Sequence, residues 1–189
     1  MALNNIILGD YIFQSDIRNV DNIYGANDVK GIATSKAFIE TKANLLGVSL
    51  TSYKVVAPSQ FAYVPDTSRR GDKISLGYND SDDTYLVSSI SIVFGIKVEK
   101  ENEILPEYLF LYFCRPEFDR YARFHSWGSA RETFSWNDMC KVRIGLPPID
   151  VQRKYVAVFK ALLANNNGSE DIKNICPVLI KGAIEEGGR

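Results

Sequence analysis

The stretch RFHSWGSARETFSW, residues 123–136, collects the rarest side chains of this chain. It holds the only histidine, His125, and both tryptophans, Trp127 and Trp136. Histidine changes charge near neutral pH, so His125 has the chemistry of a general base. No nucleophile motif such as Gly-x-Ser-x-Gly accompanies it. We therefore expect His125 to pack or hydrogen-bond structurally, with ligand contact and catalysis as the two alternatives.

Metal and cysteine chemistry find little support in the residue pattern. Cys114, Cys140 and Cys176 are far apart and form no Cys-x-x-Cys pair, and one histidine cannot complete a usual zinc site. We expect reduced thiols in a cytoplasmic protein. The acidic turn 80–83 lacks the glycine and the terminal glutamate of a calcium loop, which favours a solvated turn over a cation site. We predict no metal site and no catalytic residue.

Intrinsic methyl transfer is also disfavoured. Adenine methyltransferases place Asn or Asp before paired prolines, where its side chain binds the target amino group. Here Leu146 precedes Pro147 and Pro148, and no glycine-rich nucleotide-binding turn is present.

Two polar stretches carry side chains of the kinds that contact DNA in other proteins. Arginine and lysine bind phosphates or guanine, and hydroxyl groups bind phosphates and base edges. Helical arginines are also commonly solvated or paired with acids such as Glu117 and Asp119, so each stretch alone leaves that alternative open. With 22 basic and 23 acidic residues the net charge is −1, so any positive surface must be local. The candidate DNA-binding residues are Thr67, Ser68, Arg69, Arg70 and Lys73 in the first stretch, and Arg120, Arg123, Ser126, Trp127, Ser129 and Arg131 in the second.

The first half of the chain predicts strands. Short apolar runs at 48–50, 53–57 and 61–64 alternate with turn residues, and polar turns precede further runs after residues 72 and 83. Together they predict an antiparallel meander. Residues 90–98 alternate apolar and other side chains, which predicts a strand with one apolar face on a core.

Helices follow. Pro106 and Pro116 are expected to open two of them. In the second, Phe118, Tyr121, Ala122 and His125 recur at helical spacing and should face the core. At about 100° per residue, Arg123 lies about 60° from Arg120, and Trp127 about 20° if the helix extends that far. These side chains would then share an outer face.

The last third predicts a short helix, a strand and a longer helix. Ser135-x-x-Asp138 is typical of a capping box, and residues 142–146 predict a closing strand. Val151, Tyr155, Val158 and Leu162 then recur in 4-3-4 steps, the spacing of a coiled-coil seam, over a helix too short to dimerise by itself. We expect the tail to break at Pro177. No segment reaches the roughly 18 apolar residues of a membrane span.

The fold class expected from these elements is α+β. With 46% hydrophobic and 12% aromatic residues the chain can bury a substantial core. We expect residues 1–149 to form a globular domain with a twisted, mostly antiparallel sheet and flanking helices. Residues 150–189 would form the start of a spacer helix and a tail.

From Gly9 to Leu163 the chain resembles one target recognition domain, with the start of its spacer helix, of the specificity subunit of type I restriction-modification enzymes. The order and spacing of short motifs carry this resemblance rather than any single motif. They are Leu8-Gly-Asp-Tyr-Ile12, Phe61-Ala-Tyr-Val64, Thr67-Ser-Arg-Arg-Gly-Asp-Lys-Ile-Ser75, Tyr85-Leu-Val-Ser-Ser89 before Val93-Phe94, Leu105-Pro-Glu-Tyr-Leu109, Arg115-Pro-Glu-Phe-Asp-Arg-Tyr121, Gly128-Ser-Ala-Arg131, Leu146-Pro-Pro-Ile149 and Gln152-Arg-Lys154.

The resemblance implies a non-catalytic DNA reader that contacts one half of a split target in a host-defence system. Modification subunits with S-adenosylmethionine would methylate adenine, and a restriction subunit would use ATP and magnesium, so no cofactor is expected on this chain. The chain departs from the family in having one recognition domain instead of two and a short spacer helix. It is therefore either a half subunit, with a second copy of itself as a further partner, or a fragment.

Two other functions remain open at this point. One is a scaffold that does not bind DNA and bridges modification subunits through the helix at 150–164. The other is an independent nuclease that uses the acidic turn.

Overall fold

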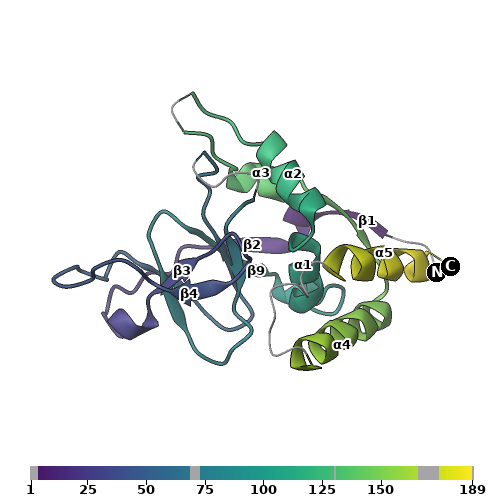
Figure 1. Ribbon diagram of the computed structural model, residues 1–189, viewed down its shortest axis with the longest axis horizontal. Helices are drawn as coiled ribbons and strands as arrows, with labels where there is room; N and C mark the ends of the chain where they lie inside the picture. The colour runs from purple at the N-terminus through teal and green to yellow at the C-terminus, as the bar shows by residue number, and fades with distance from the viewer. Residues whose placement is uncertain (1–3, 69–72, 130, 166–174, 189) are drawn as a thin grey trace. The chain divides into compact units, whose positions relative to one another are not determined.

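The computed structural model describes residues 4–68, 73–129, 131–165 and 175–188 (Figure 1). The chain forms two compact units. Unit 1 comprises Met1–Ile12, Ile96–His125 and Asn137–Arg189, and unit 2 comprises Phe13–Gly95 and Ser126–Trp136. Each unit thus combines segments that are distant in the sequence.

Antiparallel strands dominate unit 2. The largest sheet has four strands in the order β2 (Ile12–Ser15), β9 (Ile92–Ile96), β6 (Phe61–Tyr63) and β7 (Leu76–Tyr78). Two further antiparallel pairs are β3 (Lys30–Ile32) with β4 (Phe38–Glu40), and β5 (Lys54–Val56) with β8 (Tyr85–Val87). A short 3-10 turn, η2, spans Ala26–Asp28. The antiparallel expectation is confirmed. The meander was right only for the consecutive pairs β3–β4 and β6–β7, because β9 pairs with β2 and β6, and β5 pairs with β8; residues 48–50 form no strand.

The core of unit 2 lies on both sides of β9. Phe94 stacks on Phe61 with ring centroids 4.9 Å apart. The next residue back, Val93, is fully buried in a separate cluster with Ala62 and Val87. The prediction of one apolar face for this strand was therefore wrong. A strand covered on both faces carries apolar residues at consecutive positions, as residues 92–94 do.

Unit 1 is mainly helical. Its helices are α1 (Pro106–Phe113), α2 (Pro116–Phe124), α3 (Trp136–Cys140, whose first residue belongs to unit 2), α4 (Ile149–Asn165) and α5 (Cys176–Gly187). β1 (Asn4–Ile7) pairs antiparallel with β10 (Arg143–Leu146), and short 3-10 turns, η1 and η3, span Leu8–Asp10 and Val98–Lys100. The helices predicted to open at Pro106 and Pro116 and the closing strand are confirmed. The break at Pro177 was wrong, because this proline lies in the first turn of α5, where its missing N–H costs no helical hydrogen bond.

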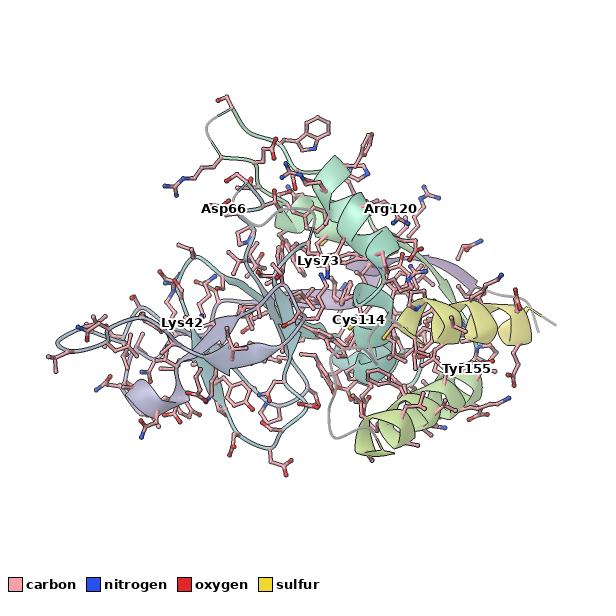
Figure 2. All side chains as sticks on the ribbon, viewed as in Figure 1. Lys42, Asp66, Lys73, Cys114, Arg120 and Tyr155 are labelled. Atoms are coloured by element: carbon pink, nitrogen blue, oxygen red, sulfur yellow. The ribbon has the colours of Figure 1, made fainter. Side chains whose placement is uncertain are left out.

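Helix α4 packs against α1 and α5. Its buried face is formed by Gln152, Val156 and Phe159. Each of these residues follows a residue of the predicted coiled-coil seam by one position. Of that seam, Tyr155 lies between α4 and α5 in Figure 2 and contacts Gly182, whereas Val158 remains 42% exposed. Within the described ranges, no helix is both long and apolar enough to cross a membrane.

Candidate nucleic-acid interface

The first predicted DNA-binding stretch is the connection between β6 and β7. Its stem closes where Val64 N donates to Ser75 O at 3.0 Å. Beyond the stem, Asp66 Oδ1 accepts hydrogen bonds from Ser68 N (3.1 Å) and Ser68 Oγ (2.7 Å). Figure 2 shows Asp66 and Lys73 on this connection, and Lys73 is exposed. Arg69 and Arg70 lie outside the described residues.

The second stretch contains a closed loop after helix α2. Trp127 N donates to Thr133 O at 3.1 Å, and Thr133 N donates to Trp127 O at 2.9 Å. Gly128 has φ of +138°, and a Cβ there would be 2.1 Å from Arg131 O, so glycine is required at this turn. The loop leaves Trp127 64% exposed, and Ser129 and Arg131 are exposed as well.

These two stretches are joined by a clasp, the name used here for residues 65–67 together with 132–134. Thr67 N and Thr67 Oγ1 both donate to Glu132 O, at 2.9 and 3.1 Å. Phe134 N donates to Pro65 O at 2.9 Å, and Asp66 pairs antiparallel with Thr133. Thr67 is only 3% exposed. The side chain of Thr67, predicted as a DNA contact, thus braces the two loops in this structure.

The clasp is anchored in the core of unit 2. Phe134 is fully buried and packs against Tyr63, with ring centroids 6.1 Å apart. Trp136 packs against Phe94 at 5.7 Å. Both aromatic residues that follow the loop thus hold its base on the sheet, while the tip at 128–131 faces solvent where it is described.

Helix α2 carries the remaining candidates. Arg120 and Arg123 are exposed on it, and Arg120 pairs with Glu117 at 3.3 Å. Arg120 is labelled on this helix in Figure 2. The helix ends at Phe124, so Trp127 does not extend its outer face as the sequence suggested. These arginines belong to unit 1, whereas Trp127 belongs to unit 2.

His125 and Ser126 follow the end of α2, and each is half-buried. The ring of His125 lies against Tyr121, with centroids 4.2 Å apart, and its backbone N–H donates to Tyr121 O. This packing agrees with the structural role expected for His125.

The other candidate chemistry gains no support. The described parts of the chain contain no group of three His, Cys, Asp or Glu that could hold a metal ion. In the acidic turn, Asn79 organises the backbone, since its Oδ1 accepts from Ser81 N (3.2 Å) and its Nδ2 donates to Asp83 O (2.8 Å). Burial raises the pKa of the Cys140 thiol, which disfavours a reactive thiolate.

The elements together define the α+β class that the sequence predicted. No protein-family model matches the chain, and comparison with curated proteins gave no match. Among solved structures, the crystal structure of the HsdS subunit from Thermoanaerobacter tengcongensis matches with a TM-score of 0.60 at 18% identity, over 87% of this chain and 43% of that chain. A structure described as the basis of complex assembly and conformational transition of the type I R-M system matches with a TM-score of 0.50 at 12% identity, over 100% of this chain and 46% of that one.

These likenesses show that the chain has the fold of the HsdS target recognition domain. The chain spans less than half the length of either matched structure. Whether any individual candidate residue contacts DNA stays a prediction.

Proposed function

We propose that this chain recognises one half of a bipartite DNA sequence for a type I restriction-modification system. The observation that carries the proposal is the clasp, which joins in unit 2 the two loops that hold the predicted DNA-binding side chains. The fold shared with an HsdS subunit supports it.

Within these two loops the side chains take different roles. Lys73 and Arg131 bind phosphates or guanine, and from the sequence alone we assign the same role to Arg69 and Arg70. Ser68 and Ser129 offer hydroxyl groups to phosphates or base edges. Arg120 and Arg123, which are exposed on α2 of unit 1, are proposed independently of these loops as further phosphate contacts.

The chain itself is non-catalytic in this proposal. Adenine methylation belongs to modification subunits that bind S-adenosylmethionine, and cleavage belongs to a restriction subunit that uses ATP and magnesium. A second copy of the chain would read the other half of the target. Magnesium-dependent cleavage by the isolated chain, abolished by Asp82→Ala, would contradict this assignment.

Selection from a pool of randomised DNA duplexes tests the proposal. We expect the full chain, alone or with modification subunits, to enrich one short motif. Arg131→Ala should weaken binding to the enriched duplex, whereas Lys42→Ala, an exposed lysine of the β4–β5 connection, should not. No enrichment at low salt would contradict DNA recognition.

A scaffold that bridges modification subunits is the second candidate. It is favoured by Val158, a residue of the predicted coiled-coil seam that is 42% exposed on α4. Formation of a complex with modification subunits, without protection of any DNA from nuclease digestion, would favour the scaffold over the DNA reader.

A further inference from the structure

Trp127 is a large aromatic side chain held in solvent by a fixed backbone. Its indole is 64% exposed, and single exposed apolar residues are ordinary on protein surfaces. What distinguishes Trp127 is its backbone, which both donates to and accepts from Thr133, at 3.1 and 2.9 Å. Thr133 Oγ1 also donates to Trp127 O at 3.4 Å. The residue is therefore presented from a closed loop rather than from a loose connection.

The support continues inward from Thr133. Its other edge pairs with Asp66, and the flanking residues Glu132 and Phe134 bond to Thr67 and Pro65. Three backbone segments therefore lie side by side, with Trp127 on the outermost one. Since Phe134 is buried against Tyr63, a force on the indole is transmitted to the sheet of unit 2.

The loop that carries Trp127, and the connection joined to it, also carry exposed polar and cationic residues. Gly128 turns the chain immediately after Trp127, and Ser129 and Arg131 are exposed on the same loop. Exposed Lys73 lies on the connection that the clasp joins to this loop. A flat apolar ring beside hydroxyl and cationic groups matches a nucleic acid, which presents flat bases between phosphates. Cores of protein interfaces, by contrast, are depleted of lysine.

We propose that Trp127 is a wedge that stacks against a base at one step of the bound duplex and partly separates that step. The inference rests on the proposed DNA recognition and adds how the DNA is deformed. Insertion of a side chain between bases breaks stacking within the DNA, which costs free energy. The inserted side chain therefore has to be held by a rigid backbone. The clasp provides that support, and the ease of opening the step then adds to sequence discrimination.

Three variants of the full chain test the wedge on a duplex enriched by the wild-type protein from a randomised pool. Trp127→Ala should weaken binding about ten- to a hundredfold, the effect of removing one aromatic that stacks on a base. Trp127→Phe keeps a flat ring and should stay within about threefold of wild type. Leu46→Ala removes a 91% exposed apolar side chain elsewhere in unit 2 and should leave binding unchanged.

The fluorescent base 2-aminopurine, placed in turn at each position of the enriched duplex, reports the opening of individual steps. We expect wild-type protein to raise its emission at one step and Trp127→Ala to raise it at none. Because the wild-type measurement needs no variant, the absence of any rise overturns the wedge even if Trp127→Ala unfolds the loop. The indole should also become less accessible to acrylamide on DNA binding, measured as the difference between wild type and Trp127→Phe.

The remaining outcomes separate the two proposals. Enrichment of a motif by wild type without a rise in emission at any step overturns the wedge and leaves DNA recognition standing. Equal binding by wild type and Trp127→Ala does the same. Shielding of the indole by modification subunits without DNA would assign Trp127 to a protein contact and overturn the wedge. Failure of wild type to enrich any duplex overturns both.

Discussion

At the scale of single residues, the side-chain amide of Gln152 connects three segments of unit 1. Gln152 is fully buried, and its Oε1 accepts from Leu105 N at 2.9 Å. Its Nε2 donates to Glu103 O and Pro147 O, each at 2.8 Å. One side chain thereby ties the start of α4 to the turn before α1 and to the end of β10.

Replacing Gln152 by methionine keeps the volume and removes these hydrogen bonds. We expect a loss of about 2–4 kcal/mol in the free energy of unfolding, because one buried and two partly buried backbone groups lose a partner. Urea denaturation measures it. The neighbouring Arg153→Met, which removes an exposed ion pair with Asp150, is the matched control and should cost less than about 0.5 kcal/mol. Equal effects of the two changes would contradict this stabilising role of the Gln152 hydrogen bonds.

Glu103 makes the stability of unit 1 depend on pH in the acidic range. Its carboxylate accepts hydrogen bonds from Lys100 Nζ and Tyr11 Oη, each at 2.8 Å. These bonds, that of Lys100 first, hold the pKa of Glu103 below its ordinary value of 4.5. A lowered folded-state pKa contributes stability above the unfolded value and loses it as pH falls through the folded value.

We therefore expect the urea midpoint of wild type to fall as pH decreases below about 4.5, and Glu103→Gln to fall less steeply over the same range. The control is Glu101→Gln, an exposed residue of the same turn, which should follow the wild-type curve. The difference should shrink in high salt because the pair is exposed. Identical slopes for wild type and Glu103→Gln would refute the assignment.

At the scale of elements, the sequence predicted local structure well and pairings between distant segments poorly. The helix openings at Pro106 and Pro116 depend on signals within one turn, and both were found. The clasp joins Thr67 to Glu132, 65 residues apart, and no local sequence pattern predicts such a pair. Thr67 was consequently predicted only as a DNA contact, and its bonds to Glu132 were not foreseen, although Gly128 and its turn were visible in the sequence.

Helix α5 shows the same limit in another form. Pro177 was interpreted as a break because proline interrupts the interior of a helix. The sequence alone does not show whether a proline lies in the interior or in the first turn. Its actual role depends on where the helix begins, and that is set by packing of Cys176, Ile180 and Ala183 in unit 1, all of them fully buried. The first turn of a helix accepts a proline without loss.

The contact of α5 with the paired prolines yields a prediction for this element. A Cβ at Gly187 would lie 2.6 Å from Pro147 Cβ and 3.1 Å from its Cα. Because the proline ring cannot rotate away, Gly187→Ala should destabilise the protein by about 1–3 kcal/mol. Thermal or urea denaturation checks this. Gly25→Ala, where a Cβ would meet nothing within 4 Å, should leave stability nearly unchanged. A Gly187→Ala protein as stable as wild type would show that α5 does not pack on Pro147 as described.

At the scale of the whole molecule, a net charge of −1 is compatible with DNA recognition only if the cations act locally. Long-range attraction to DNA follows the whole field, whereas the salt dependence of affinity counts the phosphates actually neutralised. The clasp makes a local arrangement possible, because it joins the loop that carries exposed Arg131 to the connection that carries exposed Lys73, without requiring an excess of basic residues.

The salt dependence of duplex binding therefore separates charge from stacking in this protein. If Arg131 contacts one phosphate, Arg131→Ala should reduce the slope of log affinity against log salt concentration by about one unit. Trp127→Ala should weaken binding at every salt concentration with an unchanged slope, because stacking releases no counterions. Lys42→Ala, an exposed lysine outside the clasp and its loops, should change neither quantity. Titrations of the enriched duplex at several salt concentrations measure all three variants together. An unchanged slope for Arg131→Ala would remove this guanidinium from the phosphate contacts, and a reduced slope for Trp127→Ala would show that its loss displaces the neighbouring cations rather than a stacked base.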